Sequence, residues 1–140
     1  MEQTYLEASQ TGGAALFSRH ITGAVIMLNL LRFREIADYS QHPELMPSQP
    51  VSGAEAYRLY IERTLPLLRR TGGELVFLGD GGHYLIGPDE ERWDMAMLVR
   101  QNSLQDFMGF ASDPEYLAVA GHRTAALLDS RLLPLTEMAI

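Results

Sequence analysis

The sequence contains no cysteine and no lysine, so all eleven of its basic residues are arginine. Without cysteine the chain can form no disulfide, no thiolate zinc site and no iron–sulfur cluster, and it has no thiol nucleophile. Without lysine it has no Schiff-base amine, no phosphate-loop lysine and no lysine general base. The choice of groups that could perform chemistry is therefore small.

The chain also lacks a long apolar run and an excess of positive charge. Its longest apolar stretch, residues 24–31, is interrupted by Asn29 and is too short to cross a bilayer. Residues 1–20 contain no continuous apolar segment of the kind found in secretory signals. The net charge is −7 and the arginines do not cluster, which argues against binding to a phosphate backbone. We therefore expect a cytoplasmic protein that binds neither membranes nor nucleic acid.

The length and composition are typical of a single small domain. Of the 140 residues, 46% are hydrophobic and 21% are charged, which are ordinary fractions for a soluble globular chain. A chain of this size buries about two thirds of its unfolded surface, so it needs no disulfide or structural metal to fold. We expect residues 1–23 to form a weakly structured leader or a short helix, and residues 24–140 to form the domain.

Two kinds of periodicity alternate along this domain. Runs rich in valine, isoleucine, leucine and phenylalanine predict strands at residues 24–34, 74–78, 93–100 and 132–137. Helical patterns lie between them at residues 52–70 and 103–129, the second interrupted at Asp113-Pro114. The glycine-rich segment 79–88 predicts bulges or a bent hairpin extension. Because Pro134 cannot donate to a strand ladder, the last strand is expected at a sheet edge or near a chain end.

This order of elements predicts an α+β fold of the ferredoxin-like type. Two split β–α–β units give a four-stranded antiparallel sheet with both helices on one face. Such a sheet leaves its second face uncovered. Since residues 24–34 are apolar at nearly every position, both faces of that strand should be buried. We therefore expect a homodimer in which two sheets pack against each other.

Several short motifs follow one another along the domain. They are VIMLNLLRF at residues 25–33, GAEAY at 53–57, GG at 72–73, WD at 93–94, DPEY at 113–116 and HRTAALLDS at 122–130. In this order and spacing they resemble the uncharacterised family known as domain of unknown function 1330. The resemblance implies the dimeric α+β barrel superfamily, in which two ferredoxin-like protomers enclose a pocket in each half. That superfamily includes cofactor-free monooxygenases, haem-binding peroxidases, isomerases and lyases, so the fold assigns no single activity.

Two polar residues in apolar surroundings are candidates for ligand binding. Asn29 lies in the middle of a predicted strand, where it could orient a ligand carbonyl or hydroxyl, or be a core amide bonded to a neighbouring helix. Arg123 starts from the apolar stripe of its helix, and an inward guanidinium would suit a carboxylate or enolate ligand. The alternative for this arginine is an ion pair with Asp94, Asp129 or Glu115.

Aromatic residues and histidines supply further candidates. Tyr57 and Tyr60 share the buried side of the first domain helix, Tyr57 as a candidate catalytic residue and Tyr60 as a ligand contact. Trp93 is expected to close one end of the barrel and to contact the ligand. His83, in the glycine-rich bend, is either a general base near neutral pH or an exposed loop residue. His122 is expected to face solvent or an interface.

The pattern of ligating residues predicts no dedicated metal site. Spacing leaves a single haem-ligating histidine open, but the chain is short for the haem-binding relatives, so we expect no cofactor. The four histidines show neither a His-x-His nor a His-Glu-x-x-His spacing. Two functions therefore stay open. One is a cofactor-free enzyme that performs proton transfer or monooxygenase-like chemistry on an apolar, oxygenated substrate. The other is a protein with the same pocket that binds a ligand or a partner without catalysis.

Overall fold

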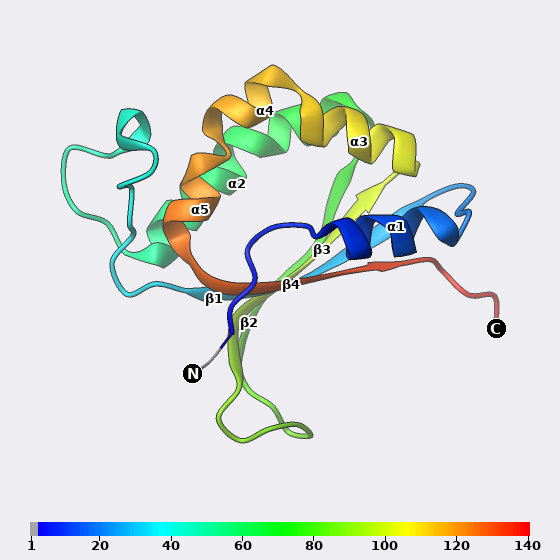
Figure 1. Cartoon of the computed structure of the whole chain (residues 1–140), viewed down its shortest axis with the longest axis horizontal. Helices are drawn as coiled ribbons and strands as arrows, with labels where there is room; N and C mark the ends of the chain where they lie inside the picture. The colour runs from blue at the N-terminus through cyan, green and yellow to red at the C-terminus, as the bar shows by residue number, and fades with distance from the viewer. Residues whose placement is uncertain (1–2) are drawn as a thin grey trace.

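A four-stranded antiparallel sheet forms the base of the structure, a computed structural model in which residues 3–140 are described (Figure 1). The strand order is β2-β3-β1-β4, and each neighbouring pair is antiparallel. The strands are β1 (Val25–Phe33), β2 (Glu74–His83), β3 (Arg92–Gln101) and β4 (Leu127–Leu135). The helices are α1 (Gln10–Ser18), α2 (Gly53–Arg70), α3 (Leu104–Ser112), α4 (Pro114–Val119) and α5 (Gly121–Ala126), with a 3-10 turn at Pro43–Leu45.

The predicted ferredoxin-like fold is confirmed. Helices α2 to α5 lie together on one side of the sheet in Figure 1. Strand β4 is an edge strand, as the proline at position 134 predicted. Among residues 3–140, no helix is both long enough and apolar enough to cross a membrane.

Local signals in the sequence account for the ends of the helices. Ser52 caps α2, and its side chain and that of Glu55 form the reciprocal hydrogen bonds of a capping box. Gly72 ends the same helix with a φ of 85°, a conformation that other residues rarely adopt. Ser103 and Asp113 cap α3 and α4 through their side-chain oxygens.

Two predicted boundaries are wrong. Strand β2 continues through the glycines to His83, beyond its predicted end at residue 78, and with β3 it forms the hairpin extension that the glycine-rich segment indicated (Figure 1). Strand β4 begins at Leu127, where the sequence predicts a helix as far as residue 129. Pairing with β1 explains this difference, because Arg32 lies opposite Asp129 and Leu31 opposite Ser130. Tertiary pairing overrides a local helical preference here.

The two faces of the sheet have different surroundings. On β1, alternate residues from Val25 to Leu31 are buried on the inner face beneath the helices. The intervening residues point to the outer face, where neighbouring strands add further apolar side chains. The outer-face residues paired across the sheet are Ile26, Leu28, Leu30, Phe77, Leu98 and Leu133. In the described part of the chain no helix covers this outer face (Figure 1).

His122 does not face solvent, so that expectation is wrong. Its side chain is 4% exposed, and its Nδ1 lies 2.8 Å from the hydroxyl of Tyr39. Tyr39 belongs to the segment between β1 and α2, which folds back over α5 and covers the imidazole. Burial lowers the pKa of His122 below the ordinary value of 6.5, and the positive charge of Arg63 lowers it further.

This buried imidazole predicts a loss of stability in weak acid. Because the pKa of His122 is lower in the folded state, the unfolded chain binds its proton first as the pH falls through about 6.5. The free energy of unfolding should therefore decrease between pH 7.5 and pH 5.5. Urea unfolding of the protein and of His122→Asn checks this, since the variant should lose less stability over that interval. The exposed His83→Asn serves as control, and equal slopes for all three proteins would contradict the assignment.

Candidate functional site

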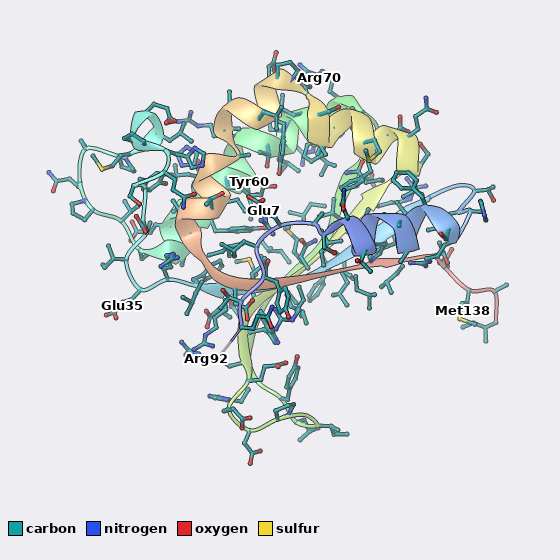
Figure 2. The ribbon with its side chains drawn as sticks, in the orientation of Figure 1. Glu7, Glu35, Tyr60, Arg70, Arg92 and Met138 are labelled. Carbon is teal, nitrogen blue, oxygen red and sulfur yellow. The ribbon has the colours of Figure 1, made fainter. Side chains whose placement is uncertain are left out.

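A pocket of about 470 Å³ lies between the inner face of the sheet and the helices above it. Residues 6–8 of the N-terminal segment form part of its wall. Figure 2 labels two lining residues, Tyr60 of α2 and Glu7 of the N-terminal segment. Most of the lining is apolar and includes Leu65, Leu68, Leu75, Val99, Phe107 and Phe110. A cavity of this size and lining is typical of a site for a small organic molecule.

Four of the six predicted site residues line this pocket. Strand β1 contributes Asn29, helix α2 contributes Tyr57 and Tyr60, and helix α5 contributes Arg123. These residues are far apart in the sequence. The fold brings them together because β1 lies under α2, and because α5 returns the chain to the sheet beside β1.

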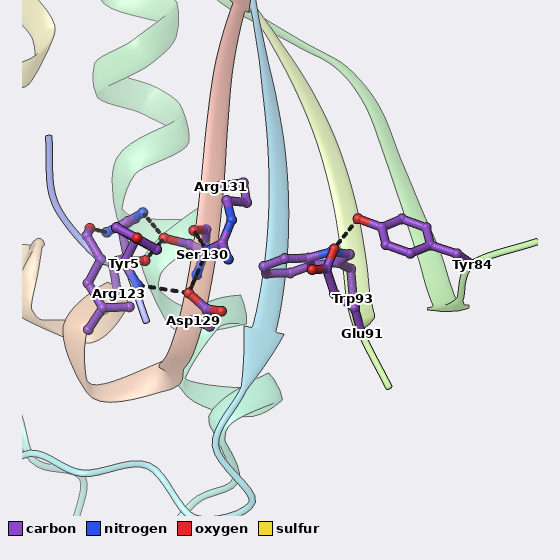
Figure 3. A network of polar contacts seen from close by, with 9 residues as sticks. Tyr5, Tyr84, Glu91, Trp93, Arg123, Asp129, Ser130 and Arg131 are labelled. Carbon is purple, nitrogen blue, oxygen red and sulfur yellow. Dashed lines mark hydrogen bonds and ion pairs between the residues drawn. The ribbon is translucent and has the colours of Figure 1, made fainter. Parts of the chain in front are cut away.

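Arg123 is bound by neutral oxygen acceptors. Its Nη1 donates to the main-chain carbonyl of Leu6 at 2.6 Å, and its Nη2 donates to the hydroxyl of Ser130 at 3.3 Å (Figure 3). No carboxylate among residues 3–140 forms an ion pair with this guanidinium. The positive charge therefore lines the pocket without a charged partner in the described part of the chain.

The three carboxylates considered as partners of Arg123 are engaged elsewhere. Asp94 accepts a hydrogen bond of 2.8 Å from the main-chain N–H of Phe33. Asp129 accepts a hydrogen bond of 2.7 Å from Arg131. Glu115, like Asp113, pairs with Arg70 on the surface. The ion-pair alternative for Arg123 is therefore not realised in this structure.

Two amide side chains on the inner face lie in the pocket wall. Asn29 is 6% exposed, and its Nδ2 donates to the carbonyl of Met27 at 3.2 Å. Gln101, at the end of β3, is 1% exposed, and its Oε1 is buried with no hydrogen-bond partner in the described chain. Such an orphaned acceptor is rare in proteins. The sequence reasoning missed Gln101, although the period-two pattern of β3 puts it on the same face as Met97 and Val99.

The two tyrosines of α2 are neutral hydrogen-bonding groups. Burial raises the pKa of Tyr57 above the ordinary 10.0, and the charge of Arg123 offsets this only in part. Burial also raises the pKa of Tyr60, whose hydroxyl lies 2.8 Å from that of Tyr116. No described residue forms a hydrogen bond with the Tyr57 hydroxyl. At neutral pH these groups can donate a hydrogen bond, but they are poor bases.

His83 and Trp93 lie outside the pocket. His83 is exposed on the β2–β3 hairpin, where its Nδ1 lies 3.1 Å from the carbonyl of Asp89. Trp93 is buried, and its Nε1 donates to the hydroxyl of Tyr84 at 2.7 Å and to Glu91 at 3.2 Å (Figure 3). The long hairpin carries both residues away from the helices. Residues 3–140 contain no cluster of three or more histidine, aspartate or glutamate side chains that could bind a metal ion.

Comparison with known proteins identifies relatives of the whole chain. Two crystal structures of the RPA0582 protein of Rhodopseudomonas palustris are similar to it. The first, described as a protein of unknown function, is 31% identical with a TM-score of 0.85, and the match covers 99% of this chain and 100% of that one. The second, of the methylated RPA0582 protein, is 32% identical with a TM-score of 0.84, covering 97% and 96%.

More distant comparisons add little. A dimeric ferredoxin-like protein of unknown function from Thermobifida fusca is 13% identical with a TM-score of 0.48, and the match covers 82% of this chain and 92% of that one. No family model matches the chain, so its resemblance to domain of unknown function 1330 stays a prediction. No curated protein matches it either.

The side-chain oxygen of Gln101, which has no partner in the described chain, predicts that this residue reduces stability. A buried carbonyl oxygen without a donor costs about 1–3 kcal/mol, and methionine has a similar shape without that oxygen. Gln101→Met should therefore raise the free energy of unfolding by about 1 kcal/mol in urea titrations. The exposed Gln105→Met on α3 is the matched control and should change it little. A destabilised Gln101→Met protein would show that the amide is a structural group.

Proposed function

We propose that this chain, which belongs to the same family as the RPA0582 protein of Rhodopseudomonas palustris, binds a small and largely apolar molecule that carries an anionic oxygen group. A carboxylate or an enolate fits this description. The apolar body of the ligand lies over the inner face of the sheet, and its anionic group contacts Arg123. The observation that supports the proposal is the guanidinium of Arg123, which lines an apolar pocket and has no carboxylate partner among residues 3–140.

The energetics of burial favour an anionic ligand. A charge that leaves water loses hydration free energy, and an opposite charge restores most of it. The planar guanidinium of arginine matches the two oxygens of a carboxylate, and such charge-assisted bonds are about twice as strong as neutral ones. An anionic ligand thus supplies the interaction that the described chain does not give Arg123.

The other polar lining groups suit the orientation of an oxygenated ligand. The Tyr57 hydroxyl can donate to a ligand oxygen, and Asn29 and Gln101 present amide groups at the pocket wall. Tyr60 supports Tyr57 by ring contact, with 5.1 Å between the ring centroids. The proposal gives no role in this site to His83 or Trp93, because neither lines the pocket. It also requires no cofactor.

A cofactor-free enzyme for proton transfer is the second candidate. Its support is the pairing of the neutral Tyr57 hydroxyl with the charge of Arg123, an arrangement that stabilises negative charge developing on a substrate oxygen. Among the described residues that line the pocket, Glu7 is the only carboxylate and would have to serve as the base. Because Glu7 lies on an exposed segment, ligand binding without catalysis is the function that we propose.

A second part of the proposal is that the active form is a cytoplasmic homodimer. The outer face presents apolar side chains on all four strands, and Leu28 lies near its centre, opposite Leu98 and Leu133. Apolar patches of this extent are costly to expose and usually mark an interface. Sheet-to-sheet packing of two copies agrees with the dimeric barrel that the resemblance to domain of unknown function 1330 implies.

The role of Arg123 can be tested with a pair of fluorescent probes that differ by one charge. Anilinonaphthalene sulfonate is apolar and anionic, and phenylnaphthylamine has the same rings without the sulfonate. Loss of a charge-assisted bond should weaken sulfonate binding to Arg123→Gln by about tenfold or more. Binding of the neutral probe should change little. Fluorescence titration measures both dissociation constants.

Two controls define the outcome of that titration. Arg69→Gln removes an exposed arginine of α2 and should leave both affinities unchanged. Ala111→Trp fills the pocket, so fluorescence that survives in this variant comes from probe bound elsewhere and is subtracted. An equal loss of affinity for both probes in Arg123→Gln would mean that the guanidinium shapes the pocket without binding an anion.

The dimer can be tested at the centre of the outer face. Leu28→Asp places a charge among apolar side chains, and it should turn a micromolar dimer into a monomer in sedimentation equilibrium. Leu85→Asp, at the 99% exposed tip of the β2–β3 hairpin, should leave the dimer intact. Circular dichroism confirms that each variant is folded. A wild-type protein that sediments as a monomer at micromolar concentration overturns this part of the proposal.

A further inference from the structure

We infer that the N-terminal strap, defined as residues 5–8, competes with the ligand for Arg123. In the structure the main-chain carbonyl of Leu6 occupies the place at the guanidinium that an anionic ligand would take. In the protein without ligand, the Leu6 carbonyl binds Arg123 in place of the anion, and the ligand displaces the strap when it binds. This inference rests on the proposed function, because it needs an anionic group at Arg123.

One end of the strap is fixed to the sheet. The main-chain N–H of Tyr5 donates to Asp129 at 2.8 Å, and the Ser130 hydroxyl donates to the carbonyl of Tyr5 at 2.6 Å (Figure 3). The guanidinium of Arg131 lies over the Tyr5 ring, 4.8 Å from its centroid. Strand β4 therefore holds Tyr5 through contacts that do not involve the pocket.

The other end of the strap is weakly held. The Leu6 carbonyl bonds to Arg123, and the Leu6 side chain packs at the edge of the core. Glu7 and Ala8 are exposed although they line the pocket, and helix α1, which follows them, contains no buried residue. Beyond the strap, Arg19 at the end of α1 donates to the carbonyl of Pro134 on β4 at 2.7 Å. The peptide groups between Leu6 and α1 can therefore move without exposing buried side chains.

Electrostatics favour the exchange. The Leu6 carbonyl accepts one hydrogen bond and carries no net charge, whereas a carboxylate or sulfonate adds an ion pair and can accept two parallel hydrogen bonds from the guanidinium. The released carbonyl is next to exposed residues and can bond to water. Because the anion binds only when the strap has left Arg123, a change that weakens docking of the strap strengthens binding of the anion, by up to the same factor while the docked strap dominates.

The strap also separates the pocket from a second hollow. Leu6, Glu7 and Thr124 line both the ligand pocket and a neighbouring hollow of about 390 Å³. Arg34 lines this hollow, and its Nε is buried without a partner in the described chain. Movement of the Leu6–Glu7 peptide and of the Glu7 side chain would widen the connection between the two spaces, so the ligand-bound site would be larger than the pocket described above.

Hydrogen exchange measured by mass spectrometry tests the inference directly. Saturating anilinonaphthalene sulfonate should speed exchange severalfold in peptides from residues 3–19, because the strap and α1 are released. The neutral phenylnaphthylamine, which cannot replace the Leu6 carbonyl, should leave these peptides unchanged. Unchanged or slower exchange with the sulfonate would overturn the inference.

Variants of the fixed end provide the reciprocal measurement. Tyr5→Ala removes the ring beneath Arg131 and loosens the strap, so it should tighten binding of the sulfonate about threefold. Tyr5→Phe keeps the ring contact and should retain the original affinity. Tyr5 does not line the pocket, so a direct ligand contact does not explain a change. Weaker sulfonate binding in Tyr5→Ala would show that the strap assists the ligand, which contradicts competition.

The two proposals fail in different ways. If Arg123→Gln binds the sulfonate as tightly as the original chain, the proposed function is wrong. If that variant loses affinity but the sulfonate protects residues 3–19 from exchange, the proposed function stands and the competing strap is wrong. Both proposals hold if Arg123→Gln loses affinity for the sulfonate and the sulfonate speeds exchange of residues 3–19 in the original chain. Arg123→Gln should then show fast exchange of the strap even without a probe.

Discussion

The charge of Arg123, which has no carboxylate partner among residues 3–140, is the constraint on which the site depends. Arg123 projects from a short helix into an apolar pocket, where it donates to a carbonyl and a hydroxyl. The nearest acidic residue along β4, Asp129, is occupied by Arg131 and by the main-chain N–H of Tyr5. Asp94, Glu115 and Asp129 bind other groups, and no carboxylate of residues 3–140 forms an ion pair with Arg123, so its charge is available to a molecule from outside the chain.

The alternation of β1 relates this pocket to the opposite face of the sheet. Asn29 and its neighbours at odd positions face the helices, and Leu28 and Leu30 face away from them. One strand thus supplies polar groups to the pocket and an apolar surface to the outer face. The pocket and the proposed dimer interface both depend on the alternating residues of β1. A one-residue change of register in this strand would therefore destroy both.

Local patterns in the sequence predict much of this fold because local chemistry determines the elements concerned. The capping groups of Ser52, Ser103 and Asp113 lie within three residues of the amides they bind. The period of β1 puts Asn29 on the buried face, and the helical period puts Tyr57 and Arg123 on inward faces. These three residues meet in the pocket because the ferredoxin-like order of elements, which the sequence predicts, brings β1, α2 and α5 together around it.

The predictions that differ from the structure depend on distant parts of the chain. His83 and Trp93 lie away from the pocket because pairing extends the β2–β3 hairpin through a glycine-rich stretch that resembles a bend. His122 is buried because the segment containing Tyr39 folds over it, a contact across 83 positions. The part played by Leu6 could not be predicted, since its contact is a main-chain carbonyl that carries no side-chain signal.

The most direct test of the central claim is a crystal structure of the protein with anilinonaphthalene sulfonate bound. The account predicts that the rings lie over Met97 and Val99, that the sulfonate oxygens bond to the guanidinium of Arg123, and that the Leu6 carbonyl has moved away. A probe bound on the outer face, or a sulfonate distant from an Arg123 still bonded to Leu6, would contradict it.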